Sequence, residues 1–136
     1  MKNGLGIGLA AFAAMGLMTF GSAFAAETVD PQMQSLMTQG KTVFLDNCAA
    51  CHGENGEGGV GPKLDGNSFI KTRANIINQV LFGAVDHGMP PFAPQLTDEQ
   101  IAAVATYVRN SWSNDSGIVL PRSVELRRAK SETTTK

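Results

Sequence analysis

The 136-residue chain is poor in cysteine, histidine and the larger aromatic side chains, with two cysteines, two histidines, one tryptophan and one tyrosine. Two cysteines exclude a framework of several disulfides. A single Cys-x-x-Cys pair, with no second such pair and no His pair, also leaves a tetrahedral zinc site incomplete. There is no internal repeat and no convincing alternating pattern of a strand, so the sequence predicts helices and loops.

Basic side chains are scarce before residue 122. Residues 26–121 carry five Lys or Arg against ten Asp or Glu, a balance of −5, whereas residues 122–136 carry five against two, a balance of +3. The acidic body gives no support for nucleic-acid binding. The basic segment 121–136 is interpreted either as a flexible C-terminal tail or as a cationic docking segment for an acidic partner or a membrane surface.

The N-terminus differs in composition from the rest of the chain. Lys2 supplies a positive start, residues 4–20 are almost all apolar or small, and Ala23-Phe24-Ala25 is an A-x-A cleavage site. This pattern predicts a signal peptide over residues 1–25, cleaved after Ala25, and export to the periplasm. The alternative is an uncleaved membrane anchor, because residues 4–26 carry no charge. Residues 26–120 would then form one small domain.

The most informative segment is Cys48-Ala49-Ala50-Cys51-His52. Residues three positions apart share one face of a helical turn, so both thiols can form thioethers with the vinyl groups of one porphyrin. The histidine that follows can place an imidazole nitrogen on the iron. The motif therefore predicts one covalently attached haem c per chain. A redox dithiol, a structural disulfide and half of a zinc site are the alternatives.

A second candidate ligand lies in Gly88-Met89-Pro90-Pro91-Phe92. The thioether of Met89 suits the sixth position of a haem iron in an electron carrier, and the two prolines stiffen the chain that presents it. The expected metal ligands are therefore His52 and Met89. Two alternatives remain: Met89 could be a packing side chain, and His87 could bind the iron instead.

The helices expected from the sequence surround these two motifs. Asp30-Pro31 is a good helix start and predicts a helix over residues 31–47, and glycines between residues 53 and 66 predict an irregular loop beside the haem. An apolar stripe predicts a helix between Arg73 and Gly83. Thr97 begins a capping box that opens the last expected helix. The buried face of that helix is expected to comprise Ile101, Val104, Ala105, Val108 and Trp112.

These features resemble the class I cytochromes c, the small soluble mono-haem cytochromes of bacteria, over about residues 33–112. The resemblance implies an all-α fold in which three to four helices wrap one haem. It also implies that Gly40 and Phe44 on the first helix cross Val104 and Tyr107 on the last.

The resemblance further implies that the Pro62 carbonyl accepts the Nδ1 proton of His52 and that Leu64 packs on the haem. The expected cofactor-binding residues are therefore Cys48, Cys51, His52, Pro62, Leu64 and Met89.

The implied activity is outer-sphere transfer of single electrons between redox protein partners, without a small-molecule substrate and without catalysis. Two alternatives are an electron-entry haem subunit of a membrane or periplasmic dehydrogenase or oxidase complex, and an enzyme or gas sensor with an open sixth position. Because a ring of lysines at the haem edge is absent, we expect apolar contact there through Val60, Pro90, Pro91, Phe92 and Ala93.

Overall fold

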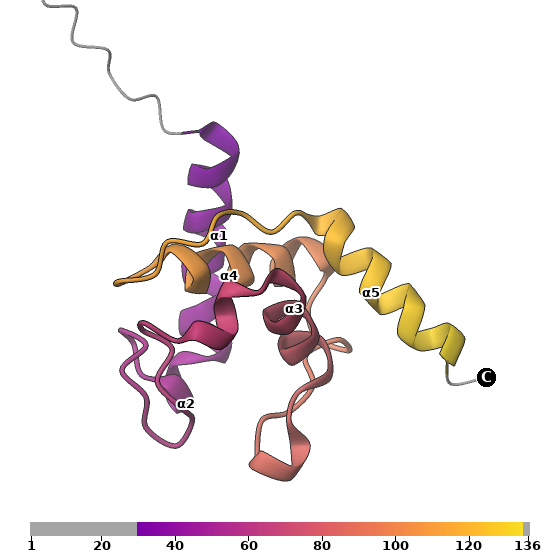
Figure 1. Ribbon diagram of the computed structural model, residues 1–136, viewed down its shortest axis with the longest axis horizontal. Coiled ribbons are helices and arrows are strands. Elements are labelled where there is room, and N and C mark those ends of the chain that lie inside the picture. Colours follow the sequence, from indigo (N-terminus) through magenta and orange to yellow (C-terminus); the bar gives the residue numbers. More distant parts are fainter. Residues whose placement is uncertain (1–29, 135–136) are drawn as a thin grey trace, which may run out of the picture.

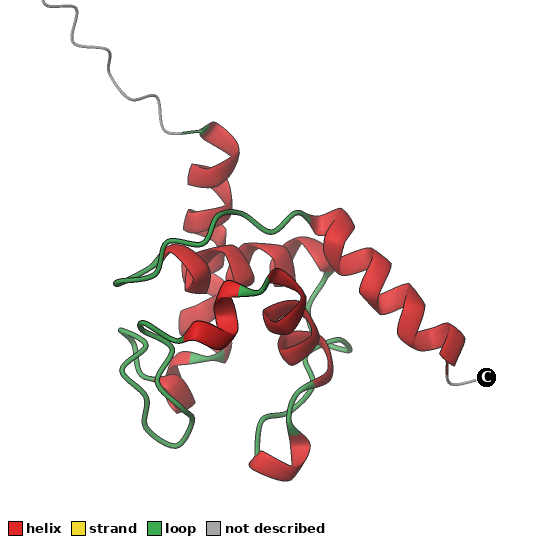
Figure 2. Cartoon of the chain, viewed as in Figure 1, coloured by secondary structure: helices red, strands yellow, loops and turns green. Residues whose placement is uncertain are grey.

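Helices make up the regular structure of the computed structural model, which describes residues 30–134 (Figures 1 and 2). Within these residues there is no strand, and Ala84 and Met89 form an isolated bridge. The predicted all-α class is therefore confirmed, whereas the predicted signal peptide lies outside the described residues. The elements in chain order are α1 (Pro31–Asn47), α2 (Ala49–His52), η1 (Ser68–Lys71), α3 (Arg73–Phe82), η2 (Val85–His87), α4 (Asp98–Asn110) and α5 (Pro121–Thr134).

The helix boundaries follow local signals in the sequence. Asp30 caps α1 by accepting a hydrogen bond from the Gln32 amide at 2.9 Å, and Pro31 occupies the first turn. Gly83, at φ 70°, ends α3. Thr97 and Gln100 form the predicted capping box at the start of α4, with hydrogen bonds of 3.0 and 3.3 Å. The predicted bounds of α1 and α3 are confirmed.

The first helix crosses α4, as Figure 1 shows. The crossing point is Gly40, where a methyl group would collide with the backbone carbonyl of Ala103 and with Cβ of Tyr107. The Phe44 ring lies 5.5 Å from the Tyr107 ring and 5.5 Å from the Trp112 ring, centroid to centroid. The predicted crossing of the two helices is confirmed.

The end of α4 differs from the prediction that Trp112 closes its buried face. The helix stops at Asn110, and Trp112 follows in a left-handed conformation with φ 59°. That backbone costs about 1–2 kcal/mol for a non-glycine residue. The Trp112 ring packs edge-on against Phe44 and Tyr107, so its contacts hold it in this conformation.

The basic segment is helical over Pro121–Thr134, which corrects the expectation of a flexible tail for these residues. Helix α5 packs on α4 and α3, and its Val124 is fully buried. Arg128 pairs with Asp98 at the start of α4 over 2.8 Å. The hydrophobic pattern of the sequence did not predict this helix, because its apolar residues do not recur at helical spacing along one face.

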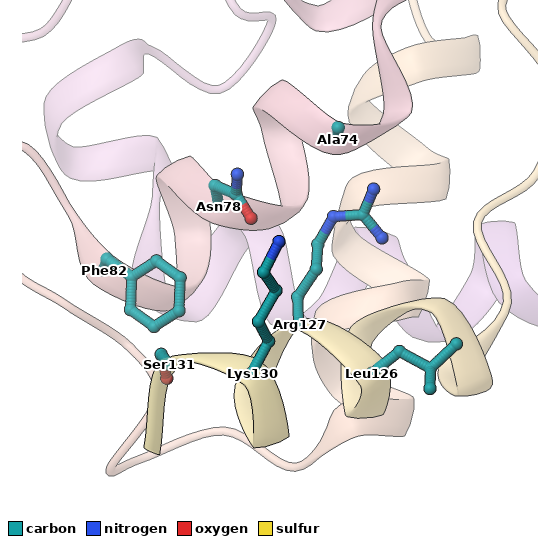
Figure 3. Close-up of a pocket in the computed structure, with 7 residues that line it drawn as sticks. All are labelled: Ala74, Asn78, Phe82, Leu126, Arg127, Lys130 and Ser131. Carbon is teal, nitrogen blue, oxygen red and sulfur yellow. The ribbon is translucent and has the colours of Figure 1, made fainter. Parts of the chain in front are cut away.

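A groove of about 750 Å³ runs between α3 and α5. Figure 3 shows its lining, which includes Phe82 on α3 and Leu126 and Arg127 on α5. None of the lining residues belongs to the expected haem site. Within residues 30–134, every helix is too short or too polar to cross a bilayer.

Candidate haem site

The two cysteines lie at the junction of α1 and α2. The chain bends at Cys48, where φ is −121°, and then forms the single turn of α2, in which the His52 amide donates to the Cys48 carbonyl at 3.0 Å. Both thiols are free, with Cys48 half-buried and Cys51 exposed. Burial raises the pKa of the Cys48 thiol to about 11, and the neighbouring Cys51 shifts it in the same direction. Because neither thiol is in a disulfide, both sulfur atoms are available for attachment.

His52 is buried and oriented by the loop that follows it. Its Nδ1 lies 2.8 Å from the Pro62 carbonyl oxygen, the contact that the resemblance implies. Because a carbonyl only accepts, this contact requires the proton on Nδ1 and leaves the Nε2 lone pair free for a metal. The imidazole is only 8% exposed, so its orientation is fixed by its surroundings as well.

Gly61 lets the loop pass directly over the imidazole. A methyl group at this position would lie 2.8 Å from Cε1 of His52 and 2.9 Å from its Nδ1, inside normal contact distance. The Gly61 amide also donates to the Cys51 carbonyl at 2.8 Å, which ties the loop to α2. Glycine is therefore required here for close approach.

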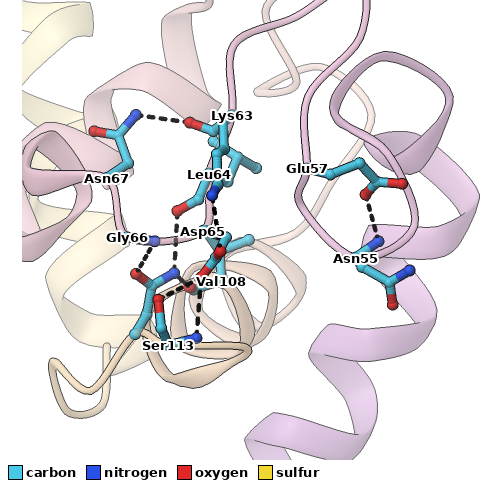
Figure 4. A network of polar contacts seen from close by, with 10 residues as sticks. Asn55, Glu57, Lys63, Leu64, Asp65, Gly66, Asn67, Val108 and Ser113 are labelled. Carbon is cyan, nitrogen blue, oxygen red and sulfur yellow. Dashed lines mark hydrogen bonds and ion pairs between the residues drawn. The ribbon is translucent and has the colours of Figure 1, made fainter.

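A polar network joins the other end of this loop to the chain after α4 (Figure 4). The Asn114 side chain accepts from the Gly66 amide at 2.9 Å and donates to the carbonyls of Leu64 at 3.1 Å and Val108 at 2.9 Å. Asn114 is buried, and all its hydrogen-bonding groups in this network have partners. The network holds Leu64 in place beside the core.

Asp65 extends the same network. Its carboxylate accepts from the Ser113 hydroxyl and from the Ser113 amide at 3.0 Å, and it pairs with Lys63 at 3.1 Å. The hydrogen bonds from Ser113, followed by the contact with Lys63, lower the pKa of Asp65 to about 2. Sequence reasoning missed this network, because Ser113 and Asn114 look like ordinary loop residues.

Met89 ends a short closed turn after α3. The Ala84 amide donates to the Met89 carbonyl at 2.9 Å, and the Met89 amide donates to the Ala84 carbonyl at 3.2 Å. Gly88, at φ 81°, makes the turn possible. The Met89 side chain is half-buried, and its sulfur accepts a hydrogen bond from Nε2 of Gln79 at 3.3 Å. Sequence reasoning missed Gln79 as well.

The chain after Met89 is fixed against α3. The Phe92 amide donates to the Val80 carbonyl at 3.0 Å and the Ala93 amide to the Leu81 carbonyl at 3.1 Å. Phe92 is buried in the core, which removes it from the expected apolar contact surface. Val60 is 92% exposed and Pro90 and Pro91 are exposed, so these three residues remain exposed as expected, whereas Ala93 is half-buried and packed on the core.

The residues present fit a covalently attached haem. Two free thiols would provide its attachment points, and the available imidazole nitrogen and the held thioether are groups of the kind that bind haem iron. Their surroundings are apolar, because Cys48, Ala49, Leu64 and Met89 are partly buried and packed on the hydrophobic core. In Figure 1, α2 and the turn that carries η2 both lie below α4.

Comparison with known proteins agrees with this geometry. The family model described as cytochrome C oxidase, cbb3-type, subunit III matches residues 35–108, more than half of the chain. The cbb3-type cytochrome c oxidase subunit CcoP of Azospirillum brasilense is 36% identical over 81 residues, a match that covers 53% of this chain and 27% of that protein.

A cytochrome c-553-like protein of Synechocystis sp. is 35% identical over 71 residues, covering 52% of this chain and 65% of that protein. The crystal structure of cytochrome cL from Hyphomicrobium denitrificans matches with a TM-score of 0.52 at 28% identity, covering 60% of this chain and 51% of that one. The chain thus spans less than two thirds of each of these relatives.

These matches place Cys48 and Cys51 at the attachment positions of a Cys-x-x-Cys-His motif, which implies covalently bound haem c. Members of the family are electron carriers or haem subunits and are not themselves catalysts. The chain belongs to the cytochrome c domain family that the cbb3-type subunit III model describes, and it is an electron-transfer domain.

Proposed function

We propose that this protein is a periplasmic carrier of single electrons whose haem c has His52 and Met89 as axial ligands. The observation that carries the proposal is the hydrogen bond that the sulfur of Met89, at the end of a closed turn, accepts from Gln79. A methionine that only fills space in a core needs no such donor. His87, the rival ligand, is exposed at the end of η2.

When bound, the haem supplies a one-electron redox couple. The Nδ1 contact of His52 with Pro62 fixes the tautomer and raises the basicity of Nε2. Gln79 holds the thioether of Met89, and the bridge between residues 84 and 89 holds its backbone. Because the fold fixes both donors, little atomic motion needs to accompany a change of charge. A sulfur donor in apolar surroundings stabilises the reduced state more than a second histidine ligand would, so it gives a higher reduction potential.

We assign contact with redox partners to the exposed apolar residues Val60, Pro90 and Pro91. The body around them is acidic, with a balance of −5 over residues 26–121. We therefore expect weaker electrostatic steering than a lysine-rich carrier shows. Rates of electron transfer should accordingly depend only weakly on ionic strength.

The test is a redox-titrated visible spectrum of the full chain, produced with its export and haem-ligation machinery. Met89→His should abolish the sulfur-to-iron absorption band of the ferric protein and lower the midpoint potential. Met33→Leu, on α1, is the matched control and should retain the band, as should His87→Gln. An unchanged spectrum in Met89→His would show that the ligand is misassigned.

A second function is favoured by the family match and by the relative CcoP, a subunit of a cbb3-type oxidase. In this alternative the domain is an electron-entry haem subunit bound to a membrane or periplasmic dehydrogenase or oxidase complex. Co-purification of the chain with such a complex from native membranes would support it. Recovery of the chain alone from the periplasmic fraction would support the free carrier.

Carbon monoxide binding separates both functions from a sensor or enzyme with an open sixth position. A ferrous protein whose Met89 is bound should take up carbon monoxide slowly or not at all. Rapid uptake would contradict the proposed ligation.

A further inference from the structure

We propose that Arg128 of α5 is a positioning residue that fixes the segment following Met89 and thereby sets how firmly the sulfur is held on the iron. The inference rests on the proposed ligation by Met89.

The guanidinium of Arg128 contacts three points of one segment. Its Nη1 donates to the Ala93 carbonyl at 2.6 Å, its Nη2 donates to the Leu96 carbonyl at 2.9 Å, and its Nε donates to Oδ1 of Asp98 at 2.8 Å. All three acceptors lie between Met89 and the first turn of α4. The planar fork of an arginine suits this arrangement, because it presents several donors in fixed directions.

The segment has few backbone donors of its own. Pro90, Pro91 and Pro94 have no N–H groups, so they cannot donate hydrogen bonds that fix the chain. The amides of Phe92 and Ala93 anchor one side of the segment to α3. Arg128 anchors the other side through the Ala93 and Leu96 carbonyls, so the chain that follows Met89 is held from two helices.

Helix α5 is itself held in place by the core, so Arg128 can fix the segment that follows Met89. Val124 is fully buried, and the residues leading into α5 are tied to α4: Thr106 Oγ1 accepts from the Val119 amide at 2.9 Å and contacts its carbonyl at 3.3 Å. The side chains of Arg128 and Asp98 are only 25% and 22% exposed, so their ion pair is partly shielded from water.

Arg128 lies outside the residues that the family match covers, whereas its three acceptors lie within them. That match ends at residue 108, whereas Arg128 is on a helix that begins at Pro121. Helix α5 therefore adds a contact to the segment after Met89 that the matched domain does not contain.

The experiment uses the full-length haem-loaded protein with the variants Arg128→Gln and Arg128→Lys. Arg122→Gln is the matched control, because Arg122 lies on the same helix, carries the same charge and pairs with Glu125 on the protein surface. Ferric protein is titrated with imidazole while the sulfur-to-iron band is recorded. Amide hydrogen exchange is measured in parallel on peptides covering residues 89–97 and residues 98–110.

We expect Arg128→Gln to lower the imidazole concentration that displaces Met89 by about three- to tenfold, the range expected for loss of one or two hydrogen bonds. Exchange in residues 89–97 should accelerate, while exchange in residues 98–110 stays close to that of Arg122→Gln. Arg128→Lys keeps the charge but lacks the fork, so it should not restore the imidazole response.

The proposal is overturned if Arg128→Gln behaves like Arg122→Gln in both measurements, if exchange accelerates equally in both peptides, or if Arg128→Lys restores the wild-type response. It is also overturned if exchange in residues 89–97 accelerates while the imidazole response is unchanged. Failure of the proposed ligation is separate, because Met89→His would then leave the spectrum unchanged whatever the exchange data show.

Discussion

The side-chain amide of Gln79 donates a hydrogen bond to the sulfur of Met89 across 3.3 Å. Gln79 lies in the last turn of α3, and Met89 lies beyond the turn that follows, so the contact joins the helix to the candidate ligand. A thioether is a weak acceptor, and its bond to an amide acts mainly to orient the side chain.

Replacing Gln79 by leucine should loosen Met89 without changing the fold. Loss of one neutral hydrogen bond costs about 0.5–1.5 kcal/mol, so imidazole should displace the sulfur at a concentration about two- to tenfold lower. Titration of the ferric protein at the sulfur-to-iron band measures this. Asn78→Leu, an exposed neighbour on α3, is the control. Equal titration curves for the two variants would contradict the orienting role.

Gly40→Ala should destabilise the crossing of α1 and α4. The added methyl group would meet the Ala103 carbonyl and the Tyr107 Cβ, neither of which can move without shifting α4. Overpacking of this kind costs about 1–3 kcal/mol, and the gain in helix propensity offsets about 1 kcal/mol. Denaturant unfolding measures the difference, with the exposed α1 variant Thr42→Ala as the control. A Gly40→Ala protein as stable as wild type would show that the helices separate easily.

Asp65 should give the protein an acid-sensitive component of stability. Its pKa of about 2 in the folded state lies below the value of about 4 in an unfolded chain. The stabilisation is therefore complete above about pH 4 and is lost as the pH falls towards 2. Asp65→Asn should flatten the free energy of unfolding over this range. Ser113→Ala removes the hydroxyl donor and keeps the amide, so it should flatten the profile only in part.

Arg109→Lys should cost roughly 2–3 kcal/mol of stability, because carbonyls that the guanidinium satisfies lose their donor. Arg109 is buried and donates to the carbonyls of Ile70 at 2.6 Å, Lys71 at 2.7 Å and Gly117 at 3.2 Å, and to that of Ser116. Burial, followed by repulsion from Arg73, lowers the pKa of Arg109.

Arg73→Lys, on the exposed start of α3, is the control for Arg109→Lys in thermal and denaturant unfolding. If both variants lose the same stability, the buried fork contributes nothing specific.

Local signals in the sequence predicted the helices that begin or end at a cap. Asp30-Pro31, Gly83 and the Thr97–Gln100 box each act within a few residues, so α1, α3 and the start of α4 are where the sequence indicates. The helix crossing at Gly40 was also predictable, but only through the family resemblance, because its contact with Ala103 is distant in the chain.

The remaining features depend on contacts that no local pattern records. Helix α5 lacks a periodic apolar stripe and is placed by Val124 and Arg128, whose partners lie on earlier elements. Gln79 sits within an apolar stripe as an ordinary polar residue, and only the turn at residues 84–89 brings Met89 to it. Phe92 follows two exposed prolines and is nevertheless buried, because its amide donates to the Val80 carbonyl of α3, a contact that no local pattern records.

The crossing of α1 and α4 has a consequence for biosynthesis. Gly40 and Phe44 find their packing partners about 60 residues further along the chain, in Ala103 and Tyr107. Among the helices, α1 contacts α2 and, far more extensively, α4, so a nascent polypeptide that has left the ribosome only as far as η2 lacks the main packing partner of the first helix. The domain therefore completes its fold only after α4 has been made, and Cys48, which is half-buried in the folded domain, stays more accessible until then, while Cys51 is exposed in the folded domain as well.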